Sequence, residues 1–320
     1  MPSPRGSGRL PITREPSIVE EIPASNAPPL ARGTPVRDAL DGAITAIAAA
    51  GCETPRLDAE LLLAHALGVS RERLFIASIP PSIGDPRECA PDLMVAGPAV
   101  RTYQDFVRRR SVLREPVAYI LSRRHFRRLE LAVDPRALIP RPETELLVEV
   151  ALTLPPRSRV LDVGTGSGAV ALALKDERPD LRVTGSDLSD DALELARGNG
   201  ERLDLDVRWL CADLLDGTPD DFDAVLCNPP YVPDGDRGAL APEILRHEPA
   251  SALFAGPDGL DVIRPLVAQA GGRTAVKLLA IEVGAGQAAV LDELMRAAGF
   301  AAVRSERDLA GIERVVVGER

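Results

Sequence analysis

The apolar residues of the chain recur with two different periods, and the change between them falls near residue 115. Before that point they return every three or four positions, which is typical of helices with one buried face. The runs of this kind are residues 36–51, 57–68 and 99–113. Gly51 and Gly68 end the first two runs, as glycine commonly does after a helix. Residues 79–98 are too rich in Pro and Gly for a regular element, so we predict a helical domain over residues 35–114 that includes one loop.

After residue 115, short apolar runs replace the helical pattern. Residues 117–121 and 129–133 have the composition of strands and enclose a basic stretch, which predicts a β-hairpin within a linker over residues 115–140. A helix is expected over residues 145–154, where two consecutive prolines end it.

From Arg159 onward, apolar strands alternate with helices. Predicted strands are residues 159–164, 182–187, 206–213, 222–228, 276–284, 301–306 and 312–318, and predicted helices are residues 168–177, 191–200, 260–272 and 287–299. Strands that are apolar on both faces and alternate with helices predict an α/β fold with a doubly wound, mostly parallel sheet in a domain over residues 141–320. The last two strands lack a helix between them and predict an antiparallel hairpin at one edge. Ligands of such sheets bind beyond the carboxyl ends of the strands.

Composition narrows the classes of function. The 320 residues suffice for two domains, and a net charge of -10 argues against a general nucleic-acid coat or a membrane-surface binder. The four cysteines, Cys52, Cys89, Cys211 and Cys227, show no metal-ligand or CxxC spacing, and the three histidines are far apart, so no metal site is expected. Cys211 and Cys227 lie inside apolar strand patterns and are expected to be buried.

The first 34 residues are rich in Pro, Ser and charge and lack the apolar core of a signal peptide. We therefore predict that residues 1–34 are a disordered extension of a cytoplasmic protein. No apolar run approaches the roughly 18 residues that span a bilayer, so no membrane association is expected.

One strand ends in the sequence Asn228-Pro229-Pro230-Tyr231, called NPPY below. Neither proline can donate a hydrogen bond, and each holds the preceding residue near extended geometry. A polar amide, rigid carbonyl acceptors and an aromatic ring at a strand end suit the binding of a planar group that carries NH2. A simple turn that ends the strand is the alternative interpretation.

A glycine-rich loop follows the first strand of the predicted sheet. It consists of Gly164, Thr165, Gly166, Ser167 and Gly168 and leads into a helix, where glycine permits close approach of a ligand and the helix amino terminus offers unpaired N–H groups. The spacing is GxGxG rather than the GxGxxG of dinucleotide enzymes. Asp162 in the preceding strand disfavours a pyrophosphate and favours a cationic ligand.

Acidic residues end the next two strands. Asp187 can accept hydrogen bonds from ribose hydroxyls, and Asp213-Leu214 offers a polar group and an apolar surface for adenine. Alternatively, Asp187 and Asp190 are helix N-caps and Asp213 forms a turn. Together with the glycine loop, the acids fit a positively charged nucleoside such as S-adenosylmethionine.

The motifs VLDVGTGSGAVAL, SD, AD and NPPY resemble those of class I S-adenosylmethionine-dependent methyltransferases that modify planar exocyclic or amide nitrogens. REPVAYIL, LIPRPETE, NPPYV and LAIEVGAGQ resemble the protein-(glutamine-N5) methyltransferases of the HemK/PrmC type, over about residues 36–320. That family methylates the glutamine of the GGQ motif in peptide chain release factors.

The resemblance implies S-adenosylmethionine as cofactor, release factors as partners, and substrate recognition by the helical domain. The site residues that it implies are Asn228, Pro229, Pro230 and Tyr231 for catalysis, and Gly164, Thr165, Gly166, Ser167, Gly168, Asp187, Asp213, Leu214 and Asn228 for the cofactor. Our hypothesis is that the Asn228 side-chain oxygen and the Pro229 carbonyl accept the two N–H bonds of the substrate amide. Tyr231 would pack on the amide plane, and Pro230 would hold the shape.

The chain departs from the family pattern at three positions. Ser122 and Arg127 stand where the family often has glycine, which predicts a different hairpin geometry. Leu214 stands where an aromatic residue is common, so adenine would be packed without stacking.

Several other residues have more than one interpretation. Arg141, Thr144 and Glu145 line the substrate entry, or fix the NPPY loop, or simply form the first turn of a helix. The arginine-rich segment 101–128 is either a solvated surface or a docking site for an acidic partner. Glu282 is expected to be structural.

Three other functions are possible, two of them within the same class of enzyme and one without catalysis. A glutamine methyltransferase of a ribosomal protein and an adenine-N6 nucleic-acid methyltransferase share the fold, although the acidic charge disfavours DNA. A non-catalytic cofactor-binding adaptor is disfavoured because no motif residue is lost. We expect a monomer that does not bind nucleic acid directly.

Overall fold

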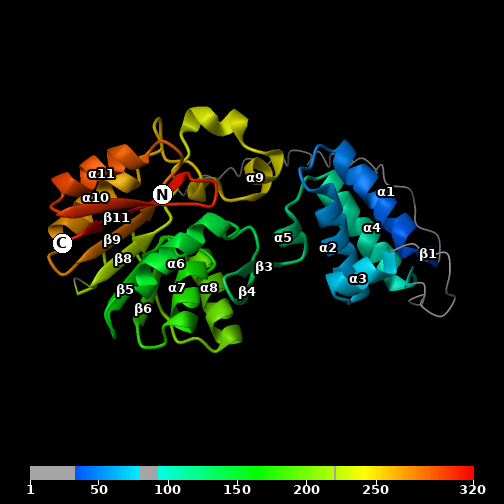
Figure 1. The fold of residues 1–320 in the computed structure, drawn as a ribbon, viewed down its shortest axis with the longest axis horizontal. Helices are drawn as coiled ribbons and strands as arrows, with labels where there is room; N and C mark the ends of the chain where they lie inside the picture. The colour runs from blue at the N-terminus through cyan, green and yellow to red at the C-terminus, as the bar shows by residue number, and fades with distance from the viewer. Residues whose placement is uncertain (1–32, 79–92, 220) are drawn as a thin grey trace, which may run out of the picture.

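The computed structural model describes residues 33–78, 93–219 and 221–320, which form a helical region followed by a sheet region (Figure 1). The helical region contains α1 (Val36–Ala49), α2 (Pro55–Leu67), α3 (Arg71–Ser78) and α4 (Pro98–Ser111), beside the antiparallel pair β1 (Thr34–Pro35) and β2 (Met94–Val95). The three predicted helices are confirmed. Strand β2 is a correction, because residues 79–98 were expected to be a loop throughout. The expected extension (residues 1–34) lies almost wholly outside the described residues.

Apolar side chains from all four helices form the core of the helical region. Ile47 of α1, Leu62 and Leu63 of α2 and Leu74 of α3 are fully buried. Tyr103 of α4 is buried too, and its hydroxyl donates to the Ala59 carbonyl at 3.3 Å. Each large apolar side chain of this kind contributes about 1.5–3 kcal/mol to stability on burial. The apolar faces predicted from the sequence therefore form the core of this region.

The hairpin between the regions begins later in the chain than predicted. Residues 117–121 were expected to be a strand, but α5 (Val117–Ile120) is a helical turn, and the hairpin consists of β3 (Arg123–Phe126) and β4 (Leu129–Ala132). Tyr119 belongs to the core of the sheet region and Ile120 to that of the helical region. Because the turn is buried from two sides, its apolar run resembles that of a strand.

A seven-stranded sheet forms the second region and confirms the predicted α/β fold. Its strands are β5 (Arg159–Val163), β6 (Arg182–Asp187), β7 (Arg208–Cys211), β8 (Ala224–Cys227), β9 (Leu278–Glu282), β10 (Ala302–Arg307) and β11 (Glu313–Glu319). Their spatial order is β10-β11-β9-β8-β5-β6-β7. The five strands from β5 to β9 run parallel, and β10 and β11 form the predicted antiparallel hairpin at one edge.

Helices cover both faces of the sheet (Figure 1). On one face lie α6 (Glu145–Leu152), α7 (Ala169–Glu177) and α8 (Asp190–Leu203), and on the other lie α10 (Ile263–Gly272) and α11 (Ala288–Ala297). Successive strand residues alternate between the two cores, so Val160 faces α7 while Leu161 faces α10.

The topology switches direction between β5 and β8. From β5 the chain continues outward to β6 and β7, whereas β8 and β9 lie on the other side. Val163 of β5 pairs with Cys227 of β8, so the residues that follow them, Gly164 and Asn228, emerge side by side. Such a switch point is where open α/β sheets bind ligands.

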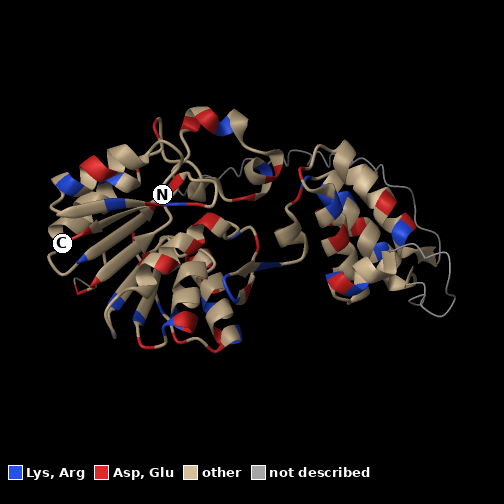
Figure 2. Cartoon of the chain, in the orientation of Figure 1, with Lys and Arg blue, Asp and Glu red and all other residues tan. Residues whose placement is uncertain are grey.

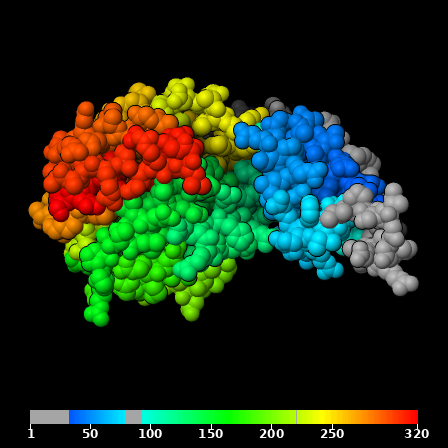
Figure 3. All heavy atoms as spheres, viewed as in Figure 1, coloured from blue at the N-terminus to red at the C-terminus, as the bar shows by residue number. Residues whose placement is uncertain are grey.

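A segment between β8 and α10 joins the two regions. It contains η2 (Asp234–Ala239), α9 (Pro242–His247) and η3 (Ala250–Ala252). Glu243 of α9 forms ion pairs with Arg110 at 3.2 Å and Arg114 at 2.5 Å, and Arg110 also pairs with Asp58 at 2.6 Å. Figure 2 shows acidic and basic residues side by side at this junction, and Figure 3 shows the surface hollowed between the two regions on one side.

These ion pairs change the interpretation of the arginine-rich segment 101–128. Arg110 is buried and Arg114 nearly so, and both are occupied by acids of the chain itself. Arg127 pairs with Glu177 at 2.8 Å and with Glu149 at 2.8 Å. Part of the segment is therefore internal structure, which neither sequence interpretation anticipated.

Of the two cysteines that were expected to be buried, one is buried and one is exposed. Cys227 is buried as predicted, but Cys211 is exposed because β7 lies at the edge of the sheet. None of the helices within the described ranges is long and apolar enough to cross a membrane.

Candidate active site

The glycine-rich loop turns sharply from β5 into α7. Gly164, Gly166 and Gly168 have φ of 67°, 55° and 83°, a backbone region that favours glycine. The Thr165 N–H donates to the Ser186 carbonyl at 2.9 Å, which ties the loop to β6. A Cβ added at Gly164 would lie 4.0 Å from the Asn228 carbonyl oxygen, so the loop and NPPY line the same space.

The carboxyl group of Asp162 stabilises this loop through hydrogen bonds. Only 2% of the residue is exposed, and one carboxyl oxygen accepts from the Thr165 hydroxyl at 2.6 Å and from the Ala171 N–H at 3.2 Å. Burial raises the pKa of the carboxyl to about 7, although both hydrogen bonds oppose this shift. Asp162 was expected to favour a cationic ligand, and the structure shows its contacts to be with the loop.

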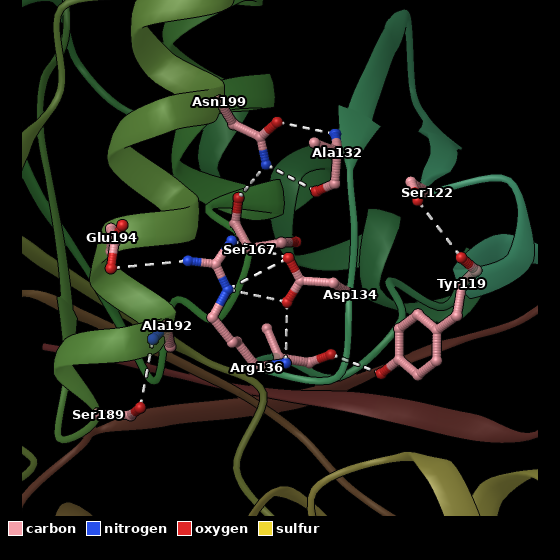
Figure 4. A network of polar contacts seen from close by, with 11 residues as sticks. Tyr119, Ser122, Ala132, Asp134, Arg136, Ser167, Ser189, Ala192, Glu194 and Asn199 are labelled. Carbon is pink, nitrogen blue, oxygen red and sulfur yellow. Dashed lines mark hydrogen bonds and ion pairs between the residues drawn. The ribbon is translucent and has the colours of Figure 1, made fainter.

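Asp187 lies at the end of β6, where it contacts the loop. Its carboxylate accepts from the Gly166 N–H at 2.9 Å and from the Ser189 N–H at 2.9 Å. Ser189 is the N-cap of α8 and accepts from the Ala192 N–H at 3.2 Å (Figure 4), so the alternative in which Asp187 or Asp190 caps this helix is wrong. A carboxylate has about four acceptor positions, and those that remain on Asp187 suit hydroxyl donors.

Asp213 and Leu214 follow β7 in a tight turn, in which the Asp216 N–H donates to the Asp213 carbonyl at 2.9 Å. Leu214 has a φ of 54°, which costs an L-residue roughly 1–2 kcal/mol. Its side chain packs against the core beneath α10. A strained apolar residue at a strand end is typical of a functional site.

The side-chain amide of Asn228 is hydrogen-bonded through its nitrogen. Its Nδ2 donates to the Thr144 hydroxyl at 3.0 Å, and Thr144 ends η1 (Pro142–Thr144), which leads into α6. Among the described residues, no donor contacts Asn228 Oδ1. The amide oxygen of this half-buried side chain is thus left as an acceptor, and the backbone carbonyl of the same residue lies beside the glycine loop. This contact supports the interpretation in which Thr144 fixes the NPPY loop, and Thr144 is also the N-cap of α6.

Tyr231 is held by the last residue of β9 and by the segment that follows this strand. Its hydroxyl donates to Glu282 Oε1 at 3.2 Å, and Gln287 Nε2 donates to its carbonyl oxygen at 3.0 Å. Gly259 lies so close that an added Cβ would be 2.1 Å from the same carbonyl oxygen. Burial, and then the charge of Glu282, raise the pKa of the Tyr231 hydroxyl, so it stays protonated and donates.

Glu282 is the buried carboxyl at the centre of this arrangement. It is 1% exposed, and its Oε2 has no hydrogen-bond partner in the described part of the chain. Burial raises its pKa to about 7, while the hydroxyls of Thr144 and Tyr231 favour the charged form. The sequence predicts a structural role for Glu282 and no role for Gln287. The available signal was an acid inside the apolar run LLAIEV.

The IPRPETE motif is fixed by α9. Glu248, which follows α9, is buried and accepts from Arg141 Nη2 at 2.5 Å and from the Ile139 N–H at 3.1 Å. Glu145 accepts from the Arg127 N–H at 3.0 Å, which fastens the motif to the hairpin. Arg141 and Glu145 therefore act within the chain as anchors of the segment that carries Thr144.

A polar network joins the linker to the glycine loop (Figure 4). Asn199 of α8 is 1% exposed and donates to the carbonyls of Ala132 at 2.9 Å and Ser167 at 3.0 Å. The Tyr119 hydroxyl donates to the Ala137 carbonyl at 2.8 Å, and a Cβ added at Gly166 would lie 3.6 Å from Ala137. Asn199 was not predicted, because a polar residue in an amphipathic helix gives no sequence sign of burial.

The chemistry of these residues fits the cofactor suggested by the sequence. The open backbone of the glycine loop allows close approach, Asp187 offers acceptors, and Leu214 offers an apolar surface. Within residues 33–78, 93–219 and 221–320, no group of three His, Cys, Asp or Glu side chains is placed to hold a metal ion.

Comparison with known proteins gives matches over most of the chain. Residues 142–256 match the Methyltransferase small domain family, and residues 38–82 match the PrmC N-terminal domain family. Among solved structures, the catalytic domain of hMettl16 in complex with an RNA hairpin aligns at 16% identity with a TM-score of 0.49, covering 59% of this chain and 74% of that chain.

The curated relatives carry a common name. A release factor glutamine methyltransferase from Deinococcus radiodurans is 40% identical over 289 residues, which cover 89% of this chain and 98% of that protein. Its namesake from Mycolicibacterium smegmatis is 39% identical, covering 90% and 98%, and that from Pseudomonas aeruginosa is 45% identical, covering 82% and 92%. Identity of this degree over nearly the full length of the relatives, together with an NPPY strand end beside a glycine loop, shows that the chain belongs to the release factor glutamine methyltransferase family.

Proposed function

We propose that this methyltransferase transfers a methyl group from S-adenosylmethionine to the side-chain amide nitrogen (N5) of the glutamine in the GGQ motif of peptide chain release factors, and so supports translation termination. Membership of the family supports the reaction and the substrate. The observation that carries the proposal is the Asn228 side-chain amide: its nitrogen donates a hydrogen bond to Thr144, its oxygen remains an acceptor, and the backbone carbonyl of the same residue lies beside the glycine loop.

The cofactor contacts that we propose come from three strand ends. Gly164, Thr165, Gly166, Ser167 and Gly168 would accommodate the amino acid part, Asp187 the ribose, and Asp213 and Leu214 the adenine. When bound, S-adenosylmethionine supplies an electrophilic methyl group on a sulfonium centre. Asn228 would border the same space, because its carbonyl lies beside Gly164.

The NPPY residues would orient the substrate rather than act as a base. An amide nitrogen is a poor nucleophile because its lone pair is delocalised into the carbonyl. Asn228 Oδ1 and the Pro229 carbonyl would accept its two N–H bonds, while Tyr231 packs on the amide plane and Pro230 holds the shape. Orientation of this kind can supply roughly 7–11 kcal/mol of the barrier reduction.

The reaction balances without a further reactant. The substrate nitrogen would gain the methyl carbon as the S–C bond of the sulfonium breaks, and the donor would leave as a neutral thioether. One N–H proton is then released to water, so the product amide is neutral. Tyr231 is not the proton acceptor, because its hydroxyl is protonated and donates to Glu282.

We further propose a division of labour along the chain. Residues 35–114 would recognise the release factor, residues 115–140 would link, and residues 141–320 would bind the cofactor and catalyse. The hollow between the two regions would admit the GGQ loop (Figure 3). We expect a cytoplasmic monomer whose partner is a protein, with no direct nucleic-acid or membrane contact.

The test is methyl transfer from labelled S-adenosylmethionine to a purified release factor and, in parallel, to its GGQ-to-GGA variant, to DNA and to ribosomal protein. We expect incorporation into the release factor that disappears with the glutamine. Labelling of DNA alone or of ribosomal protein alone would move the substrate to one of the rival functions. Cofactor binding without any labelling would favour the adaptor.

A further inference from the structure

Two residues outside NPPY contact its first and last side chains from the protein interior. Thr144 bonds to the Asn228 amide at 3.0 Å, and Glu282 bonds to the Tyr231 hydroxyl at 3.2 Å. Thr144 is 4% exposed and Glu282 is 1% exposed, so water does not compete for either contact. Both contacts are therefore made from the protein interior.

The contact with Thr144 decides which end of the Asn228 amide faces outward. Nδ2 can only donate and Oδ1 can only accept. Because the Thr144 oxygen accepts from Nδ2, Oδ1 lies on the opposite branch of the amide, where a substrate N–H can reach it. In the flipped orientation, the Asn228 NH2 would face the substrate NH2, and two donors would oppose each other.

Glu282 in turn decides how the Thr144 hydroxyl is directed. A threonine hydroxyl has one hydrogen, and it could be donated to Asn228 Oδ1 if no better acceptor were near. Thr144 and Tyr231 are both near the Glu282 carboxyl, and the Thr144 hydroxyl lowers the pKa of that carboxyl by stabilising its charged form. With its hydrogen directed at Glu282, Thr144 presents lone pairs to Asn228, and only Nδ2 can meet them.

We propose that Thr144 and Glu282 are positioning residues that hold the Asn228 amide with Oδ1 toward the substrate nitrogen and fix Tyr231 beside it. The inference rests on the proposed function, because it assigns the acceptor of the substrate amide. Neither residue contacts the reacting atoms. Their action passes through Asn228 and Tyr231.

Two variants test the effect of the Thr144 hydroxyl separately from the effect of the side-chain volume. Thr144→Val keeps the volume and removes the hydroxyl, and we expect kcat for methyl transfer to fall roughly 10- to 100-fold because the amide is no longer oriented. Thr144→Ser keeps the hydroxyl and recovers most of this loss. The dissociation constant of S-adenosylmethionine and the melting temperature stay close to wild type. Thr144→Ala serves as a second hydroxyl-free variant with a smaller side chain.

A matched control lies at the other end of the same helix. The Thr153 hydroxyl donates to the Val150 carbonyl at 2.8 Å and contacts no site residue. Thr153→Val therefore removes an equivalent hydroxyl without affecting kcat. For Glu282, Glu282→Leu removes the acceptor and lowers kcat, whereas Glu282→Gln keeps an acceptor oxygen and recovers part of the rate.

A spectroscopic signature reports the amide without any turnover. The chain has only three asparagines, Asn26, Asn199 and Asn228, so protein labelled with ¹⁵N-asparagine gives three side-chain NH2 pairs, and Asn228→Asp assigns one of them. We expect the Asn228 pair to exchange slowly in the wild type, and to shift and exchange faster in Thr144→Val and Glu282→Leu. The Asn199 pair, bonded to the Ala132 and Ser167 carbonyls, is the internal control.

The outcomes distinguish this inference from the proposed function. An Asn228 pair that is unchanged in Thr144→Val, or a Thr144→Ser variant that loses as much kcat as Thr144→Val, would overturn the positioning roles. A wild-type protein that methylates no release factor would overturn the proposed function instead, and the NH2 spectra would still decide whether Thr144 orients Asn228.

Discussion

The helical region and the sheet region differ in where their buried polar side chains lie. Among the described residues of the helical region, the buried polar ones are Asp58, Glu60 and Arg110, and all three form ion pairs with other residues of the chain. In the sheet region, many lie near the carboxyl ends of the strands, among them Asp162 and Glu282. Buried charge in the helical region forms ion pairs, one of which, between Arg110 and Glu243, fixes the contact with the sheet region. In the sheet region, buried carboxyls shape a site instead.

The largest expected effect comes from removing the acceptor at the strand end. Asn228→Ala should lower the rate of methyl transfer on the order of 100-fold or more, as the loss of one preorganised polar contact does. Single-turnover kinetics with release factor measure the rate, and calorimetry measures cofactor and substrate affinity. A variant that binds both normally and reacts at near the wild-type rate would place the chemistry elsewhere.

The second effect is a pH dependence of stability in the sheet region. The pKa of Glu282 is raised from 4.5 to about 7, so its contribution to stability is present below pH 4.5 and is lost as the pH rises through 7. Glu282→Gln removes this dependence. Between pH 5 and 8, we expect the stability of the wild type to fall relative to the variant by about 2–3 kcal/mol, since each pKa unit corresponds to about 1.4 kcal/mol.

Denaturant unfolding at the two pH values measures this difference. Asp162 has a similarly raised pKa, but it is present in both proteins and cancels in the comparison. A gap between the two proteins that stays constant from pH 5 to pH 8 would show that Glu282 is charged throughout.

The third effect tests the contact between the regions. Glu243→Gln leaves Arg110 and Arg114 without their shared carboxylate, so the helical region should be held less firmly. We expect KM for an intact release factor to rise roughly tenfold, or about 1.4 kcal/mol, while kcat with a short GGQ peptide is unchanged. Glu293→Gln on α11, which is exposed, is the matched control. Equal losses with protein and peptide would mean that the junction serves the chemistry itself.

The smallest effect concerns the turn that connects the regions. Ser122 and Arg127 have φ of 54° and 51°, so each adopts a conformation that favours glycine. Ser122→Gly should raise the free energy of unfolding by about 0.5–1 kcal/mol by relieving this strain. Arg127→Gly should lower it, because the ion pairs with Glu177 and Glu149 are lost. Chemical denaturation checks both, and a destabilised Ser122→Gly would show that the serine is unstrained.

The same comparison explains what the sequence could predict. Parallel strands place their carboxyl ends at one edge, so the glycine loop, Asp187 and NPPY could be brought together from their positions in the chain alone. The register of Val163 with Cys227 confirms that Gly164 and Asn228 meet. Local chemistry and topology suffice for this part of the site.

Contacts between distant segments could not be predicted in this way. Glu243 and Arg110 are 133 positions apart, and Asn228 and Thr144 are 84 apart, so no local period relates them. The helical turn α5 was mistaken for a strand because its apolar residues are divided between two cores. Ser122 and Arg127, in place of glycine, were expected to alter the hairpin. Both residues instead adopt the positive-φ backbone that favours glycine.

The most direct test of the account is to locate the transferred methyl group. Tandem mass spectrometry of a release factor incubated with S-adenosylmethionine and wild-type protein should find one methyl group, on the side-chain amide of the GGQ glutamine, and only a trace of it after the same incubation with Asn228→Ala. A methyl group on any other residue, or the same glutamine methylated to the same extent by Asn228→Ala, would contradict the assignment of this strand end as the catalytic site.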